Sequence, residues 1–184
     1  FGLDASKKTL LIVGGSLGAR TINQSVIAHL EVLAASDIQV IWQTGKFYIE
    51  DARKAFVPFA NERIIVTDFV SRMDYAYAIA DLVISRAGAS SISELCLLSK
   101  PVILVPSPNV AEDHQTKNAM ALVQKNAAVM ITDANAREQM IPEALSLIQN
   151  ETKLMELSKN ISTLAERNSA ERIVDEISKL LKKA

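Results

Sequence analysis

The feature that most constrains the fold is a regular alternation of short apolar runs with segments of helical periodicity. The runs are mainly apolar, four or five residues long, and lie at residues 9–13, 38–42, 63–67, 82–85, 101–105 and 128–131. Strands that are apolar along their whole length are buried on both faces, which is typical of parallel sheets. Because helical, right-handed crossovers join such strands, the pattern predicts a doubly wound, Rossmann-like parallel sheet of about six strands.

Apolar residues at helical spacing predict the segments between these strands. The first helix is indicated by Ile22, Val26, Ile27, Leu30 and Leu33. Further helices are expected around 47–56, 73–80, 94–98 and 111–125. From Pro142 onward the chain is predicted to be helical, with a break near Asn168 and Ser169. We expect residues 142–184 to pack on the sheet domain or to cross out of it.

Composition limits the classes of protein that the chain can represent. Its 184 residues, 49% hydrophobic and 22% charged, suit one globular domain. A net charge of −1 provides no overall field for nucleic acid or an anionic membrane. A single cysteine, Cys96, excludes an internal disulfide framework, and its leucine neighbours predict a buried structural thiol. No cluster has metal-ligand spacing, and no apolar run reaches the ~20 residues of a membrane span.

Three unusual loops follow strands. In the first, Gly14-Gly15-Ser16-Leu17-Gly18 leads into a helix. Glycines permit close backbone approach, and the helix N-terminus presents N–H groups, so this loop can hold a diphosphate. Its spacing is neither the GxGxxG fingerprint nor a P-loop. The alternative interpretation is a plain tight turn.

The second loop combines small residues with a carboxylate. Gly88-Ala89 leads to Ser91-Ile92-Ser93-Glu94, and the predicted helix would carry Glu94 in its first turn. Ser91 and Glu94 fit the spacing of a capping box, which would be purely structural. Small residues also leave room for a second phosphate contact, and a carboxylate nearby can accept hydrogen bonds from both ribose hydroxyls. Both interpretations stay open.

The third loop opens a polar helix. Gln115 and Asn118 are three residues apart and share one helical face, and their amides suit sugar hydroxyls. A solvated first turn is the alternative. His114, beside Asp113, is interpreted as a surface or binding residue rather than a catalytic base. Since the carboxyl ends of parallel strands share one sheet edge, the three loops together predict a nucleotide-sugar site.

Four segments, in order, resemble the C-terminal half of the MurG family of bacterial glycosyltransferases (glycosyltransferase family 28): VGGSLGARTIN, TDFVSRM, SRAGASSISEL and PSPNVAEDHQTKNA. The resemblance covers essentially the whole chain. It implies one half of a GT-B fold, in which two Rossmann-like domains flank a cleft. Residues 1–184 would then be a single C-terminal, UDP-sugar-binding domain, with the N-terminal acceptor domain absent from this chain.

The resemblance also implies roles for individual residues. The diphosphate would be lined by Gly15, Ser16, Gly18 and Ser91. The uracil would be framed by Phe69 and Val70, with Met73 packing nearby, and Glu94 would take the ribose hydroxyls. The N-acetylglucosamine would be read by Gln115 and Asn118. His114 stands where the family often has a second glutamine, and Arg20 belongs to the motif without a role that we can derive.

The implied activity is an inverting transfer of N-acetylglucosamine from UDP-N-acetylglucosamine to lipid-linked N-acetylmuramyl-pentapeptide in peptidoglycan synthesis. The catalytic base and most membrane contact would belong to the missing domain, so this chain alone should be soluble, bind donor and not turn it over. The full protein would act peripherally at the cytoplasmic face of the bacterial inner membrane. No metal or other cofactor is expected, because helix N-termini can stabilise the leaving diphosphate.

Two other functions fit the same residues. One is a different GT-B nucleotide-sugar enzyme, such as a lipid glycosyltransferase or a sugar epimerase, which a panel of donors would distinguish. The other is a nucleotide-binding module without chemistry. An upstream glycine-rich loop with a histidine would favour the enzyme over the module.

Overall fold

The structure is a computed structural model that describes residues 1–181, and it places six strands in one parallel sheet. The strands are β1 (Thr9–Val13), β2 (Gln39–Gln43), β3 (Ile64–Thr67), β4 (Leu82–Ser85), β5 (Val102–Leu104) and β6 (Val129–Met130). Their order in the sheet is β3-β2-β1-β4-β5-β6. The chain therefore builds outward from β1 and then restarts at β4 on the other side. This arrangement confirms the predicted doubly wound sheet and puts the topological switch point between β1 and β4.

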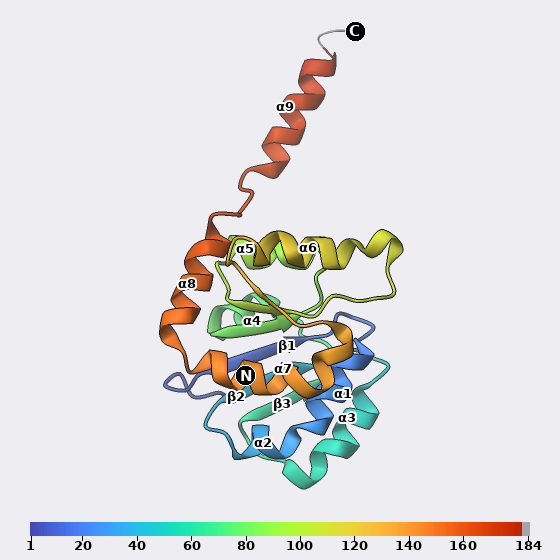
Figure 1. Cartoon of the computed structure of the whole chain (residues 1–184), viewed down its shortest axis with the longest axis vertical. Helices are drawn as coiled ribbons and strands as arrows, with labels where there is room; N and C mark the ends of the chain where they lie inside the picture. The colour runs from blue at the N-terminus through green and yellow to red at the C-terminus, as the bar shows by residue number, and fades with distance from the viewer. Residues whose placement is uncertain (182–184) are drawn as a thin grey trace.

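Helices connect the strands and cover both faces of the sheet (Figure 1). They are α1 (Arg20–Ala28), α2 (Leu30–Ala35), α3 (Ile49–Phe56), α4 (Met73–Ile79), α5 (Ala89–Leu97), α6 (His114–Val123), α7 (Asp133–Ile148), α8 (Glu151–Ser162) and α9 (Ser169–Leu181). Two short 3-10 helices, η1 (Val57–Phe59) and η2 (Ala111–Asp113), precede β3 and α6.

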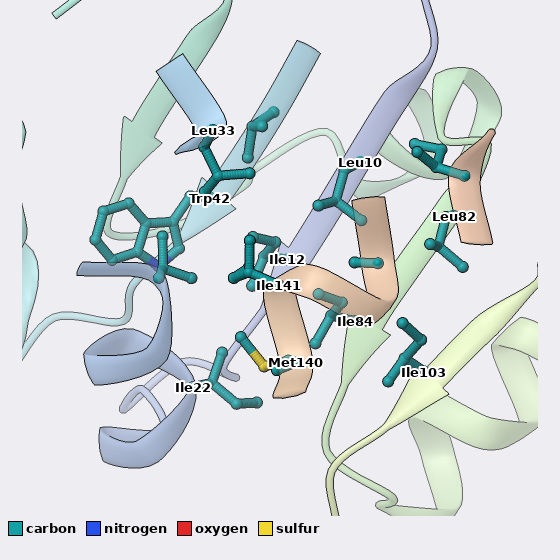
Figure 2. Close-up of a cluster of buried hydrophobic side chains, with 14 of the residues drawn as sticks. Leu10, Ile12, Ile22, Leu33, Trp42, Leu82, Ile84, Ile103, Met140 and Ile141 are labelled. Carbon is teal, nitrogen blue, oxygen red and sulfur yellow. The ribbon is translucent and has the colours of Figure 1, made fainter. Parts of the chain in front are cut away.

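One core cluster lies between the sheet and the helices α1, α2 and α7 (Figure 2). Leu10 and Ile12 from β1, Trp42 from β2 and Ile141 from α7 all have no exposed surface. The buried indole N–H of Trp42 has a hydrogen-bond partner, because Nε1–H donates to Asn23 Oδ1 at 2.9 Å. Burying one such aliphatic side chain stabilises the fold by about 1.5–3 kcal/mol, so this cluster is a main source of stability.

A second core cluster covers the opposite face, where α4, α5 and α6 pack. Leu11 of β1 points here, between the two neighbours that enter the first cluster, because successive strand residues face opposite sides. Leu95 and Cys96 of α5 are buried in this cluster. Burial raises the pKa of the Cys96 thiol, in agreement with the predicted buried structural thiol. The two clusters explain why the strands are apolar throughout.

Two predicted helices are interrupted. The first divides into α1 and α2 at His29, whose φ of −121° leaves the helical region. The second, expected over 111–125, begins only at His114, because Glu112 and Asp113 have positive φ angles of 51° and 53°. The apolar spacing is continuous across the first break, and residues 112–118 at the second are all polar, so periodicity marks neither break.

The chain is helical at Pro142 as predicted, but the helix starts earlier, because α7 begins at Asp133 and contains Pro142 in its interior. An interior proline costs about 3 kcal/mol in a helix. Six side chains of α7 are buried and together outweigh that cost: Ala136, Met140, Ile141, Ala144, Leu147 and Ile148.

The last two helices differ in their packing. α8 buries Leu154, Leu157 and Ile161 against the body, whereas α9 projects away from it (Figure 1). The predicted break is confirmed at Asn168, whose φ is 59°, and α9 starts at the next residue. Residues 142–181 therefore both pack on the sheet domain and cross out of it, and residues 182–184 of the predicted range lie outside the described part. No helix within residues 1–181 is long and apolar enough to cross a membrane.

Candidate functional site

The loops that follow β1 and β2 touch each other at the carboxyl edge of the sheet. Gly18 and Gly45 have positive φ angles of 92° and 78°. A Cβ on Gly45 would lie 2.1 Å from the backbone nitrogen of Gly18, so only glycine fits there. Gly15 also has a positive φ of 82°, but a Cβ there would meet nothing within 4 Å. The contact therefore fixes one end of the loop and leaves Gly15 open to a ligand.

Helix α1 begins directly after this loop and presents its N-terminus to the same edge. No side chain caps it, since its N-cap is Ala19, and its first turn holds no acidic residue. The first N–H groups of a helix carry partial positive charge and have no partner within the helix. Ser16, predicted to line a diphosphate, is exposed beside them. Asn23 connects α1 to the loop after β2, because its Nδ2 donates to the Thr44 carbonyl at 2.8 Å.

The second loop is not a capping box. Helix α5 has Gly88 as its N-cap and begins at Ala89, so Ser91 is already the third helical residue and makes no cap hydrogen bond. The first turn carries no acidic residue, and Glu94 lies in the second turn, which corrects our prediction. The capping-box interpretation of the Ser91–Glu94 spacing is therefore excluded.

Glu94 is exposed, but one of its oxygens is held by a neighbouring helix. The Tyr77 hydroxyl of α4 donates to Glu94 Oε2 at 3.1 Å. Tyr77 is only 6% exposed. Burial, and then the negative charge of Glu94, raise the pKa of Tyr77 well above its ordinary value, so the hydroxyl stays protonated and continues to donate. Sequence analysis missed Tyr77, because the two residues are 17 positions apart on different helices.

Backbone groups orient the two amides that were predicted to bind the sugar, one from the loop after β5 and one from the loop after β4. The Ser107 N–H donates to Gln115 Oε1 at 2.9 Å, and Asn118 Nδ2 donates to the Ala87 carbonyl at 3.1 Å. A backbone N–H can only donate and a carbonyl can only accept, so each amide has one possible orientation. Gln115 is left with its N–H₂ group as donor, whereas Asn118 is left with its Oδ1 as acceptor.

His114 begins α6 and is exposed. Its Nδ1 lies 2.8 Å from the Ala111 carbonyl. The carbonyl only accepts, so Nδ1 carries the hydrogen and Nε2 of the neutral ring can accept a hydrogen bond. His114 is thus at the surface, and within residues 1–181 no carboxylate hydrogen-bonds to its ring as in a catalytic relay.

The three residues predicted around the uracil lie after β3 with different exposure. Phe69 is 59% exposed, Val70 only 6%, and Met73 is partly buried against the second core cluster. Phe69 and Val70 help to line a hollow of about 270 Å³. Phe69 can therefore offer a ring face to a base, while the side chain of Val70 belongs mainly to the core.

A charged network that sequence analysis missed joins the loops. Arg86 follows β4, and its Nη1 lies 2.5 Å from Asp133 Oδ1 at the start of α7. Thr21 of α1 donates to the other oxygen of Asp133 at 2.8 Å. Arg86 and Asp133 help to line a hollow of about 590 Å³ that also reaches Arg20 and Gln115. The hollow is thus lined by residues that follow β1, β4 and β5, but Ser91, Glu94 and Asn118 are not among them.

Another hollow, of about 680 Å³, lies away from these loops, by the amino ends of the strands. Its charged residues pair with one another, since Lys8 Nζ lies 3.4 Å from Asp81 and 3.7 Å from Glu151. Lys100 donates to the Ala80 carbonyl at the end of α4. These contacts are structural. In the part of the chain that is described, no three histidine, cysteine or acidic residues gather as a metal site would require.

Comparisons with known proteins identify the family of the chain. The model of the glycosyltransferase family 28 C-terminal domain matches residues 9–177. The UDP-N-acetylglucosamine--N-acetylmuramyl-(pentapeptide) pyrophosphoryl-undecaprenol N-acetylglucosamine transferase of Parabacteroides distasonis is 62% identical over 183 residues, which cover 100% of this chain and 50% of that protein. The corresponding transferase of Phocaeicola vulgatus is 59% identical and is matched over 49% of its length.

Among solved structures, MurG of Acinetobacter baumannii superimposes with a TM-score of 0.81 at 28% identity, over 94% of this chain and 50% of that one. The Staphylococcus aureus MnaA–UDP complex has a TM-score of 0.72 at 15% identity and supports the fold alone. The chain spans about half the length of the curated relatives it matches. It therefore belongs to glycosyltransferase family 28, of which it carries the C-terminal domain.

Proposed function

We propose that residues 1–184 form the UDP-N-acetylglucosamine-binding domain of a glycosyltransferase that adds N-acetylglucosamine to a lipid-linked muramyl-pentapeptide. The observation that carries the proposal is that the loops after β1, β4 and β5 lie at one edge of the sheet, at its topological switch point, and offer polar groups for a ligand. The names of the relatives supply the donor and the acceptor. The acceptor would bind the half of those proteins that this chain does not span.

The diphosphate is assigned to the N-terminus of α1 and the loop before it. Gly15 allows the ligand to approach the backbone, and the uncapped N–H groups of α1 supply partial positive charge. Ser16, Gly18 and Ser91 are the further diphosphate residues. The same groups would stabilise the negative charge of UDP as it leaves, so the transfer step does not require a metal on this domain.

The ribose is assigned to Glu94. A carboxylate has about four lone-pair sites, so Tyr77 occupies one and others stay available for hydroxyl groups. Because the Tyr77 hydroxyl holds the carboxylate in place, less side-chain entropy is lost when the ribose binds. Phe69 would cover the uracil ring, with Val70 also lining that hollow and Met73 packing nearby against the second core cluster.

The sugar is assigned to Gln115 and Asn118, with His114 at its margin. The two amides present opposite groups, a donor from Gln115 and an acceptor from Asn118. Such a pair can recognise a hydroxyl that accepts from one side chain and donates to the other. The catalytic base would come from the other half of the full-length protein, so we expect this chain to bind donor without transferring it. We further propose that the full-length enzyme works at the cytoplasmic membrane surface.

The test is calorimetric titration of the chain with UDP-N-acetylglucosamine, comparing the wild type with Glu94→Ala. Loss of a charged hydrogen-bond partner should cost about 1.5–3 kcal/mol of binding, which is roughly a tenfold to hundredfold weaker affinity. Glu138→Ala, an exposed glutamate of α7 outside the proposed site, is the matched control and should bind normally.

Two results would contradict the proposal. If Glu94→Ala binds as well as the wild type and only its melting temperature falls, Glu94 is structural. If a panel of UDP-sugars binds no better than UDP alone, the sugar assignment is wrong. Equal preference for another UDP-sugar would favour a different nucleotide-sugar enzyme.

A further inference from the structure

The residue that connects the proposed diphosphate and sugar loops is Arg86. Its Nη1 lies 2.5 Å from Asp133 Oδ1, 3.0 Å from the Val105 carbonyl and 3.1 Å from the Pro106 carbonyl. One guanidinium therefore contacts the end of β5 and the start of α7 from the loop after β4. The side chains of Arg86 and Asp133 are 18% and 21% exposed, so solvent weakens their attraction only in part.

The Pro106 carbonyl that Arg86 contacts belongs to a peptide group with a second partner. The same peptide group carries the Ser107 N–H, which donates to Gln115 Oε1 at 2.9 Å. A planar trans peptide directs its carbonyl and its N–H to opposite sides. The Pro106–Ser107 peptide is thus held between Arg86 and Gln115, and its plane sets the orientation of the Gln115 amide.

The positive charge of Arg86 strengthens the hydrogen bond between the Ser107 N–H and Gln115. A positive group that binds the carbonyl polarises the peptide and strengthens the hydrogen bond that its N–H donates. Asp133 fixes the guanidinium, and the Thr21 hydroxyl fixes Asp133 from α1, the helix at the diphosphate loop. The connection therefore runs from α1 through Asp133, Arg86 and one peptide group to Gln115.

We propose that Arg86 and Asp133 are positioning residues that orient Gln115, and so control binding of the sugar moiety rather than of UDP. This inference rests on the proposed function, because it requires Gln115 to contact the sugar. Neither residue needs to touch the ligand. A purely structural ion pair would instead affect UDP and UDP-sugar alike.

The experiment measures the dissociation constants of UDP and of UDP-N-acetylglucosamine for the chain. The dissociation constant of UDP divided by that of UDP-N-acetylglucosamine gives the contribution of the sugar to binding. Arg86→Gln and Asp133→Asn should lower that ratio about fivefold or more, while the affinity for UDP alone changes less than twofold. Arg86→Lys keeps the charge but loses the planar fork, so it should recover only part of the ratio. Thr21→Val should lower the ratio about twofold, because Arg86 and Asp133 still pair.

A double-mutant comparison separates this inference from the proposed function. In a Gln115→Ala background, Arg86→Gln should have no further effect on the ratio. If Gln115→Ala itself leaves the ratio unchanged, the sugar assignment fails. If Gln115→Ala lowers the ratio but Arg86→Gln does not, only the positioning inference fails.

Thermal melting identifies variants that do not fold. If Arg86→Gln does not fold, Arg86→Lys and Thr21→Val decide the question, since the first keeps the charge and the second leaves the Arg86–Asp133 pair intact. Equal weakening of UDP and UDP-N-acetylglucosamine in these two variants would overturn the inference.

Discussion

Helices α7 and α9 both carry apolar residues at helical spacing, but their surroundings are opposite. α7 buries six side chains against the sheet and α1, whereas in α9 Ile173, Val174, Ile177 and Leu180 are between 51% and 69% exposed. Figure 1 shows α7 within the packed body and α9 projecting from it. Apolar spacing therefore indicates a helix and its apolar face, but not whether that face has a partner within the chain. Substitutions in the body and in α9 should therefore differ sharply.

The largest effect is expected for Ile141→Ala in α7. Ile141 has no exposed surface and packs in the first core cluster (Figure 2). Its truncation leaves a cavity and should lower the free energy of unfolding by about 2–5 kcal/mol. Urea denaturation of the chain measures this. A loss below 1 kcal/mol would mean that α7 is not packed as described.

A smaller effect within the body is expected for Gly45→Ala. The new Cβ would clash with Gly18, and the φ of 78° is unfavourable for alanine, so the substitution should cost about 1–3 kcal/mol. Gly15→Ala is the matched control, because its φ is also positive but its Cβ would meet nothing within 4 Å. Equal losses in the two variants would show that backbone conformation, and not the contact between the loops, is responsible.

Tyr77→Phe should have a moderate effect that depends on pH. Losing the hydrogen bond to Glu94 should cost about 0.5–1.5 kcal/mol at neutral pH. The pKa of Tyr77 is raised by folding, so its contribution is fully present below its unfolded pKa of about 10 and is lost as pH rises above that value. Denaturation from pH 8 to 11 should show wild-type stability falling toward that of Tyr77→Phe. A constant difference would contradict the assigned cause.

The smallest effect is expected for Ile177→Ala in α9. Its side chain is 51% exposed, so the free energy of unfolding should change by no more than about 0.5 kcal/mol. Compared with Ile141→Ala, this variant is the direct test of the difference between the two helices. A loss above 1 kcal/mol that grows with protein concentration would mean that α9 packs against a second copy of the chain.

Much of the body could be predicted because local patterns determine it. The strands are apolar throughout, since both faces of the sheet are covered, and the glycines at 15 and 18 mark positive φ angles. The break before α9 was also predictable. The start of α7 was not, because the packing of its buried face outweighs a proline signal that normally marks a helix boundary.

By itself, the sequence determined the order of strands and helices, the doubly wound sheet and the loops that carry the candidate site. Only the tertiary structure decided which side chains hold those loops. Tyr77 meets Glu94 across 17 positions and Arg86 meets Asp133 across 47, and the direction of the Gln115 amide depends on a backbone N–H in another segment. The physical reason is that periodicity indicates which face of a helix or strand is buried, whereas hydrogen bonds between distant residues depend on which elements pack together.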